Sequence, residues 1–192
     1  MHEESLNRVI RDYLTGEDVE ETSYEEFRQA LARLLVEERG FPRDRLCAKV
    51  GVCFPVDGRD YTRMVDLAAF SEDGAPLLVV IFCSGEPGSY IRETLAASRL
   101  FPGGPAPLAL ITDTKEALLL RVPDGHILAR GGMRVIPFHD ELAALAASAA
   151  APPLSEAALE RERRILFAYS EFLSGGCCAG ACRPAAKKGA AG

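Results

Sequence analysis

The residues best suited to metal or redox chemistry lie near the C-terminus, in the sequence CCAGAC. Cys177, Cys178 and Cys182 bring three thiols together within six positions. Thiolates are good ligands for soft metals, so this cluster could hold Zn²⁺ or Cu(I), or an iron–sulfur cluster completed by a fourth ligand from elsewhere in the chain. The spacing matches no standard zinc motif. The alternative interpretation is a flexible tail in which the three thiols are incidental.

A second stretch that could do chemistry is the glycine-rich segment SGEPGSY at 84–90, between a predicted strand and a predicted helix. The backbone N–H groups at a helix N-terminus can bind an anion, and Ser89 would stand beside them. The segment does not have the P-loop pattern, because no Gly-Lys-Ser/Thr follows. An ordinary loop is therefore the favoured interpretation, and we find no Ser-His-Asp arrangement in the chain.

The elements that must position these residues follow from hydrophobic periodicity and turn signals. Ser23 is a predicted N-cap, with Glu26 three residues later completing a capping box, and Gly40 is the predicted stop of that helix. The predicted helices are 3–14, 23–39, 89–101, 139–150 and 156–173, and the predicted strands are 46–55, 62–70, 77–83, 108–112, 117–122, 126–129 and 133–137. This order predicts an α/β fold with a mixed sheet and flanking helices.

Length and charge limit the classes of function. The 192 residues suffice for one domain and leave no room for a large multidomain enzyme. The net charge of −6 belongs to the first 40 residues, which hold 5 Arg and 11 acidic residues, while the rest is neutral. Free nucleic-acid binding usually needs a basic face, and no dense basic run is present.

The N-terminal sequence and the cysteines suggest a compartment. MHEESLNRVIRDYL lacks the layout of a signal peptide, and no apolar run approaches the roughly 18–20 residues that span a bilayer. We therefore expect a cytoplasmic protein without a membrane partner, whose cysteines are reduced. Cys47, Cys53 and Cys83 fit the role of small buried residues on predicted strands.

Several segments, taken in order, carry a family resemblance. They are TSYEEFRQALARLLVEERGFP, TRMVDLAAF, EDGAP, LLVVIFCS and PLALITD. Together they resemble the N-terminal nuclease domain of type I restriction enzyme R subunits (HsdR), within the PD-(D/E)xK nuclease superfamily. The resemblance covers roughly residues 22–138. It implies a restriction-endonuclease-like fold with a helix, an antiparallel meander, a crossover helix and a further strand.

The resemblance also implies where catalytic residues would lie. Such nucleases hold Mg²⁺ with acidic residues on the second and third meander strands, and a Lys on the third strand helps to activate water. Asp66 occupies the first acidic position, and Glu26 matches the Glu that the first helix often adds. The third strand carries Phe82–Ser84 in place of Glu-x-Lys. Glu86, two residues beyond, is the remaining candidate acid, which would have to move into the site.

The missing residues imply a degenerate site. One carboxylate is a poor Mg²⁺ site, because Mg²⁺ keeps its waters and needs several charges to converge. The non-catalytic interpretation of Asp66 is a strand-end residue or a paired surface acid, and that of Glu26 is the capping box itself. With this resemblance, the predicted organisation is an N-terminal helical extension (1–20), a nuclease-like α/β domain (21–150), a C-terminal helix (151–174) and a flexible Cys-containing tail (175–192).

Three hypotheses about function remain open. The first is a stand-alone nuclease-like domain that has lost catalysis and binds nucleic acid or a protein partner. The second is an active metal-dependent DNA endonuclease that uses Asp66, Glu26 and a displaced Glu86 with Mg²⁺. The third is a metal- or redox-responsive protein that acts through Cys177, Cys178 and Cys182. The oligomeric state is not indicated by any of these features.

Overall fold

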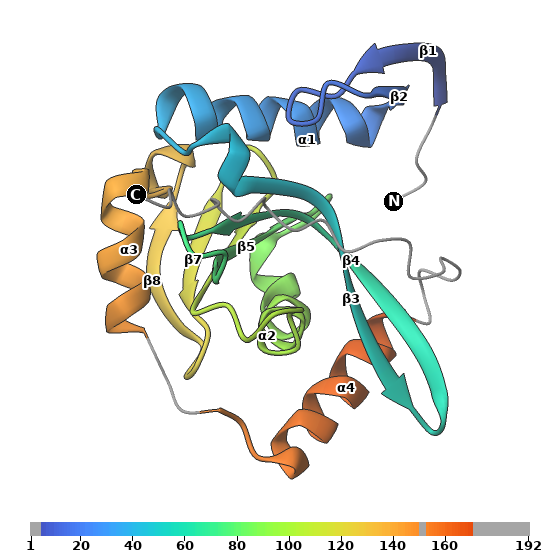
Figure 1. Cartoon of the computed structure of the whole chain (residues 1–192), viewed down its shortest axis with the longest axis vertical. Coiled ribbons are helices and arrows are strands. Elements are labelled where there is room, and N and C mark those ends of the chain that lie inside the picture. The colour runs from blue at the N-terminus through green and yellow to red at the C-terminus, as the bar shows by residue number, and fades with distance from the viewer. Residues whose placement is uncertain (1–4, 150–152, 171–192) are drawn as a thin grey trace, which may run out of the picture.

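The structure is a computed structural model that describes residues 5–149 and 153–170. Within these residues the centre is a six-stranded mixed sheet whose strands lie side by side in chain order (Figure 1). The strands are β3 (Leu46–Val56), β4 (Arg59–Phe70), β5 (Pro76–Phe82), β6 (Leu108–Thr112), β7 (Ala117–Arg121) and β8 (His126–Gly131). Neighbouring strands are antiparallel except β5 and β6, which are parallel.

The parallel pair explains the crossover helix. Parallel neighbours cannot be joined by a tight hairpin, and α2 (Ile91–Arg99), preceded by the 3₁₀ turn η3 (Pro87–Tyr90), makes the connection. Both strands are rich in buried aliphatic residues, so both sheet faces need a cover. The predicted mixed α/β fold with flanking helices is confirmed at this level.

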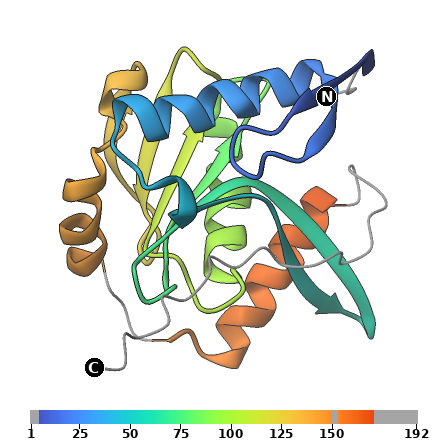
Figure 2. The ribbon, with the colours of Figure 1, turned by 45° about the horizontal axis from the view of Figure 1, so that its top comes forward.

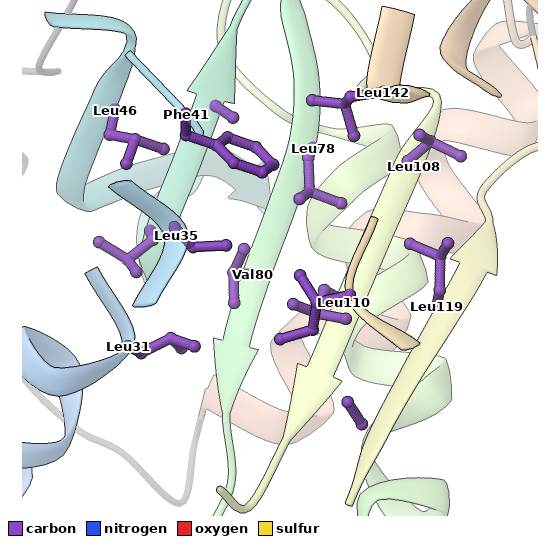
Figure 3. Close-up of a cluster of buried hydrophobic side chains, with 14 of the residues drawn as sticks. Leu31, Leu35, Phe41, Leu46, Leu78, Val80, Leu108, Leu110, Leu119 and Leu142 are labelled. Atoms are coloured by element: carbon purple, nitrogen blue, oxygen red, sulfur yellow. The ribbon is translucent and has the colours of Figure 1, made fainter. Parts of the chain in front are cut away.

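Helices cover both faces of the sheet. α1 (Ser23–Arg33) and α3 (His139–Ser148) lie on one face, whereas α2 packs with α4 (Glu156–Ser170) on the other (Figures 1 and 2). Figure 3 shows the core beneath α1 and α3, which is almost wholly aliphatic. Its labelled members are Leu31, Leu35, Phe41, Leu46, Leu78, Val80, Leu108, Leu110, Leu119 and Leu142.

From Ser5 onward, where the structure describes the chain, the helix predicted for residues 3–14 is wrong, and so is the helical character of the extension 1–20. Ser5–Arg11 forms the strand β1, which pairs antiparallel with β2 (Asp18–Thr22). The connection is stabilised by Asp12, whose carboxylate accepts hydrogen bonds from the N–H groups of Leu14 and Thr15, both at 2.8 Å. Gly16 completes it with a φ of 74°, a conformation that glycine adopts without strain.

The start of α1 differs from the prediction by one residue. Thr22, not Ser23, is the N-cap, and its Oγ1 accepts a hydrogen bond from the Glu25 N–H at 3.0 Å. Thr22 ends β2 in an extended conformation, so the N-cap falls on the last strand residue. The predicted stop at Gly40 is confirmed, after a single π-helical turn, η1 (Leu34–Glu38).

Most of the predicted strands are confirmed, and one is wrong. The β3–β4 turn holds Asp57 and Gly58 at φ of 50° and 77°, as a two-residue hairpin requires. The strand predicted for 133–137 is instead a 3₁₀ turn, η4 (Met133–Val135). The reason is that the Val135 and Ile136 N–H groups bond within this turn, to the carbonyls of Gly132 and Met133.

The C-terminal helices are confirmed as α3 and α4 over their described parts. The predicted residues 150 and 171–173, the boundary at 150/151 and the tail 175–192 lie outside the described residues. Among the residues that are described, none of the helices has the length and hydropathy that crossing a bilayer requires.

The cap of α1 gives a first testable prediction. We expect Thr22→Ala to lower the free energy of unfolding by about 1 kcal/mol, because the Glu25 N–H loses its acceptor. The matched control is Ser23→Ala, since the Ser23 hydroxyl has no hydrogen-bond partner among described residues and its loss should cost less than about 0.5 kcal/mol. Urea denaturation followed by circular dichroism measures both variants. Equal losses would show that Thr22 is not the effective cap.

Candidate functional site

Asp66 lies in the interior near the middle of β4, with 7% of its surface exposed. The Phe82 N–H at the end of β5 donates a hydrogen bond to Asp66 Oδ2 at 2.6 Å. The backbone pairing of β4 with β5 extends as far as Leu67 and Val80, and the Asp66 carboxylate takes over as acceptor beyond it. The side chain therefore extends the pairing of the two strands.

The Asp66 side chain belongs to the sheet face that α2 covers. The Cys83 thiol, which packs in a cluster with Leu95 of α2, is one of the groups on which Asp66 acts electrostatically. Glu93 of α2 is close enough to act electrostatically on Asp66. Both neighbours belong to the α2 side of the sheet, so Asp66 lies on that side.

Phe82 lies on the other face. Its ring centroid is 5.3 Å from that of Phe27 and 6.2 Å from that of Tyr24, and both partners belong to α1. We call Tyr24, Phe27 and Phe82 the aromatic surface, because Phe27 is 40% exposed and the other two are partly exposed. The two positions that the resemblance assigns to metal-binding acids are thus on opposite faces of the sheet.

Burial raises the pKa of Asp66 to about 7. The Phe82 N–H favours the carboxylate and opposes this shift, whereas the negative charge of Glu93 adds to it. The carboxyl group therefore exchanges its proton near neutral pH. Arg63 pairs with Glu93 at 2.5 Å and not with Asp66.

Glu26 and Glu86 are not brought to Asp66. Glu26 is exposed on α1 and lines a groove of about 550 Å³ beside Ile10 of β1. Glu86 caps η3 by accepting the Ser89 N–H at 3.0 Å, and it pairs with Arg130 at 3.1 Å. In residues 5–149 and 153–170, no group of three His, Cys, Asp or Glu side chains could hold a metal ion.

The structure also contains a buried charge network that the sequence analysis missed. Arg28 of α1, with its side chain 1% exposed, pairs with both Asp12 and Glu25. Lys49 of β3 reaches the same Glu25, with its Nζ 2.8 Å from Oε2. The i,i+3 spacing of Glu25 and Arg28 could have indicated an ion pair between them. Pairs with this spacing usually lie on the surface of a helix, so the spacing did not indicate a buried network.

The network holds its two carboxyl groups in the charged form. Burial raises the pKa of Asp12, but hydrogen bonds from the Thr15 N–H and from Arg28 outweigh it and leave the pKa below its usual value. Burial likewise raises the pKa of Glu25. Its interactions with Arg28 and Lys49 outweigh that effect and leave the pKa below its usual value. Both groups therefore stabilise the fold above their ordinary pKa values, and this stabilisation is lost as the pH falls through the lowered values.

The cysteines show no catalytic environment among the described residues. Cys47 and Cys83 are buried, as predicted, but Cys53 is exposed. Burial raises the pKa of the Cys83 thiol to about 11, so it stays protonated and weakly reactive at neutral pH. The predicted metal ligands Cys177, Cys178 and Cys182 lie outside the described residues.

Comparisons with known proteins give no relative: no family model, no curated protein and no solved structure matches this chain.

The buried network supports a second testable prediction. We expect Arg28→Met to cost about 3–5 kcal/mol, because it leaves two buried carboxylates without their main cation. Lys49→Met should cost about 1 kcal/mol or less, since the Lys49 side chain is 47% exposed. Urea denaturation at pH 7 measures both. A similar small cost in the two variants would contradict a role for Arg28 as the central cation.

Proposed function

We propose that this chain is a restriction-endonuclease-like domain that does not cleave DNA and instead binds a protein through its aromatic surface. The order of elements supports the first part. α1 precedes the antiparallel strands β3, β4 and β5, then α2 crosses over to β6, which is parallel to β5. This is the order that the resemblance implies.

The loss of catalysis is supported by the surroundings of each candidate acid. Asp66 bonds to a backbone N–H and faces α2, Glu26 lies on the groove beside β1, and Glu86 is held by η3 and Arg130. Mg²⁺ requires oxygen ligands that converge at about 2.1 Å, which these three side chains do not offer. The third strand also has no Lys to stabilise the transition state.

The observation that carries the binding proposal is the position of Phe82. Where the resemblance calls for a metal-binding acid, this chain has a ring that stacks on Phe27 with an interplanar angle of 17°. Phe27 is itself an exposed large apolar residue. Exposed aromatic side chains grouped on one surface are characteristic of protein-binding sites.

Charge favours a basic protein segment over DNA as the partner. Tyr24 and Phe27 belong to the first 40 residues, which carry the whole net charge of −6. Nearby basic side chains are engaged internally, as in the pairs of Arg28 and Lys49 with Glu25. A DNA phosphate backbone would be repelled from this region, whereas a segment that combines apolar and basic residues would be attracted.

The absence of catalysis is testable with supercoiled plasmid DNA and Mg²⁺ or Mn²⁺. We expect the wild-type protein to nick no more DNA than Asp66→Ala does, because no group of three His, Cys, Asp or Glu side chains in the described part of the chain could hold the metal ion. Gel electrophoresis over a time course measures the nicked fraction. Metal-dependent nicking by the wild type that Asp66→Ala abolishes would establish the endonuclease hypothesis instead.

The binding surface is testable with a labelled amphipathic peptide made of Leu and Lys, measured by fluorescence anisotropy. We expect Phe27→Ser to weaken binding of this peptide about tenfold or more, because the surface loses one apolar anchor. The matched control Phe138→Ser removes another exposed Phe, 48% exposed, that lies outside the aromatic surface. A Leu/Glu peptide should bind poorly. Equal effects of the two substitutions, or tighter and salt-dependent binding of duplex DNA, would overturn the proposal.

A further inference from the structure

Arg45 is a buried cation without a counter-ion in the described part of the chain. It ends the 3₁₀ turn η2 (Arg43–Arg45) directly before β3, and 4% of its surface is exposed. Its Nη1 is completely enclosed, and its side chain makes neither a hydrogen bond nor an ion pair with any residue that the structure describes. Arginine cannot give up its proton to avoid the cost of burial, so the guanidinium gains most from an anionic acceptor.

The other buried charged side chains of the described residues have partners. Arg28 pairs with two carboxylates, and Glu93 pairs with Arg63. Asp66 accepts a backbone N–H. This contrast identifies Arg45 as the buried charge that an acceptor from outside the described residues would stabilise.

Arg45 stands at the beginning of an edge strand. β3 is the outermost strand of the sheet (Figure 1), and β4 is its one strand neighbour among the residues described. Farther along β3, Lys49 lines a groove of about 390 Å³, and the β1–β2 hairpin forms the other wall through Ser5, Val19 and Glu20. Extended chain rises about 3.3 Å per residue, so four residues of β3 span about 13 Å. One short extended segment can therefore reach both Lys49 and Arg45.

Strand polarity decides which end of such a segment meets Arg45. If the segment is antiparallel to β3, its C-terminal end lies beside the start of β3, whereas a parallel segment would bring its N-terminal ammonium there. Strand addition at a sheet edge and capture of a terminal carboxylate are both recurring modes of peptide recognition. The stretch Arg43–Val56 contains three basic residues and one acid, so its charge favours an anionic end.

We infer that Arg45 is the anchor of a peptide-binding site at the edge of β3. Its ligand is the C-terminal carboxylate of an extended segment of a partner protein, which pairs antiparallel with β3. The carboxylate forms a charge-assisted pair with the guanidinium. The site is separate from the aromatic surface, whose rings belong to α1 and to the end of β5, and it does not depend on that surface binding a protein.

The test uses two labelled hexapeptides of alternating Thr and Val, one with a free C-terminal carboxylate and one amidated, with the full chain and fluorescence anisotropy. We expect the acid to bind about tenfold or more tightly than the amide, because only the acid can pair with Arg45. Arg45→Met should remove this difference and leave the affinity of the amide unchanged. The matched control is Arg59→Met, at the other end of the pairing opposite Val56, and it should keep the difference.

Strand addition has its own readout. Methylation of alternate backbone nitrogens of the acid peptide, in the register that faces β3, should abolish binding because the N–H donors are removed. Phe27→Ser should leave binding of the acid peptide unchanged, so failure here and failure of the proposed function are distinguishable. Undiminished binding of both possible methylated registers would contradict pairing with β3.

Stability distinguishes a ligand anchor from a structural cation. Because Arg45 has no partner among the described residues, Arg45→Met should leave the urea midpoint of the free protein unchanged or raise it. The acid peptide should raise the midpoint of the wild type and not that of Arg45→Met. The inference would be overturned by equal affinities of acid and amide, by no binding up to about 1 mM, by a preference that Arg59→Met removes, or by a lower midpoint for free Arg45→Met.

Discussion

The burial of β5 and β6 on both sides is the constraint on which the rest of this structure depends. Their residues are almost all apolar, and a strand of that kind is stable only where other elements exclude water from both faces. The parallel contact of the two strands requires a crossover, which brings α2 to one face. α1 and α3 cover the other face, and the β7–β8 hairpin extends the sheet beyond β6.

The same sheet decides what the candidate site can do. Successive side chains of a strand alternate between faces, so the position of a residue on β4 or β5 directs its side chain toward α1 or toward α2. Asp66 falls on the α2 side and Phe82 on the α1 side. A metal site needs its acids on one side, whereas an exposed aromatic cluster needs only Phe82 and the two rings of α1.

Of the four buried carboxyl groups in the described part of the chain, three have a cationic partner and Asp66 does not. Glu25 is paired with Arg28 and Lys49, and Glu93 is paired with Arg63. These cationic partners offset the cost of removing the carboxylates from water. Asp66 is the exception, because its hydrogen-bond donor is a neutral backbone N–H. A buried carboxyl group without a cation avoids the cost of a buried charge by keeping its proton, so the pKa of Asp66 is raised to about 7.

By itself, the sequence determined the mixed α/β class, the central strands and helices α1 to α4, because strong periodicity and turn residues such as Asp57 and Gly58 act locally. It did not determine β1, since Val9 and Ile10 suit a helix or a strand and the pairing with β2 decided between them. Nor did it determine the network around Arg28 or the opposite facing of Asp66 and Phe82. Those depend on which distant residues the sheet register and the packing of α1 and α2 bring together, and only the tertiary structure decided that.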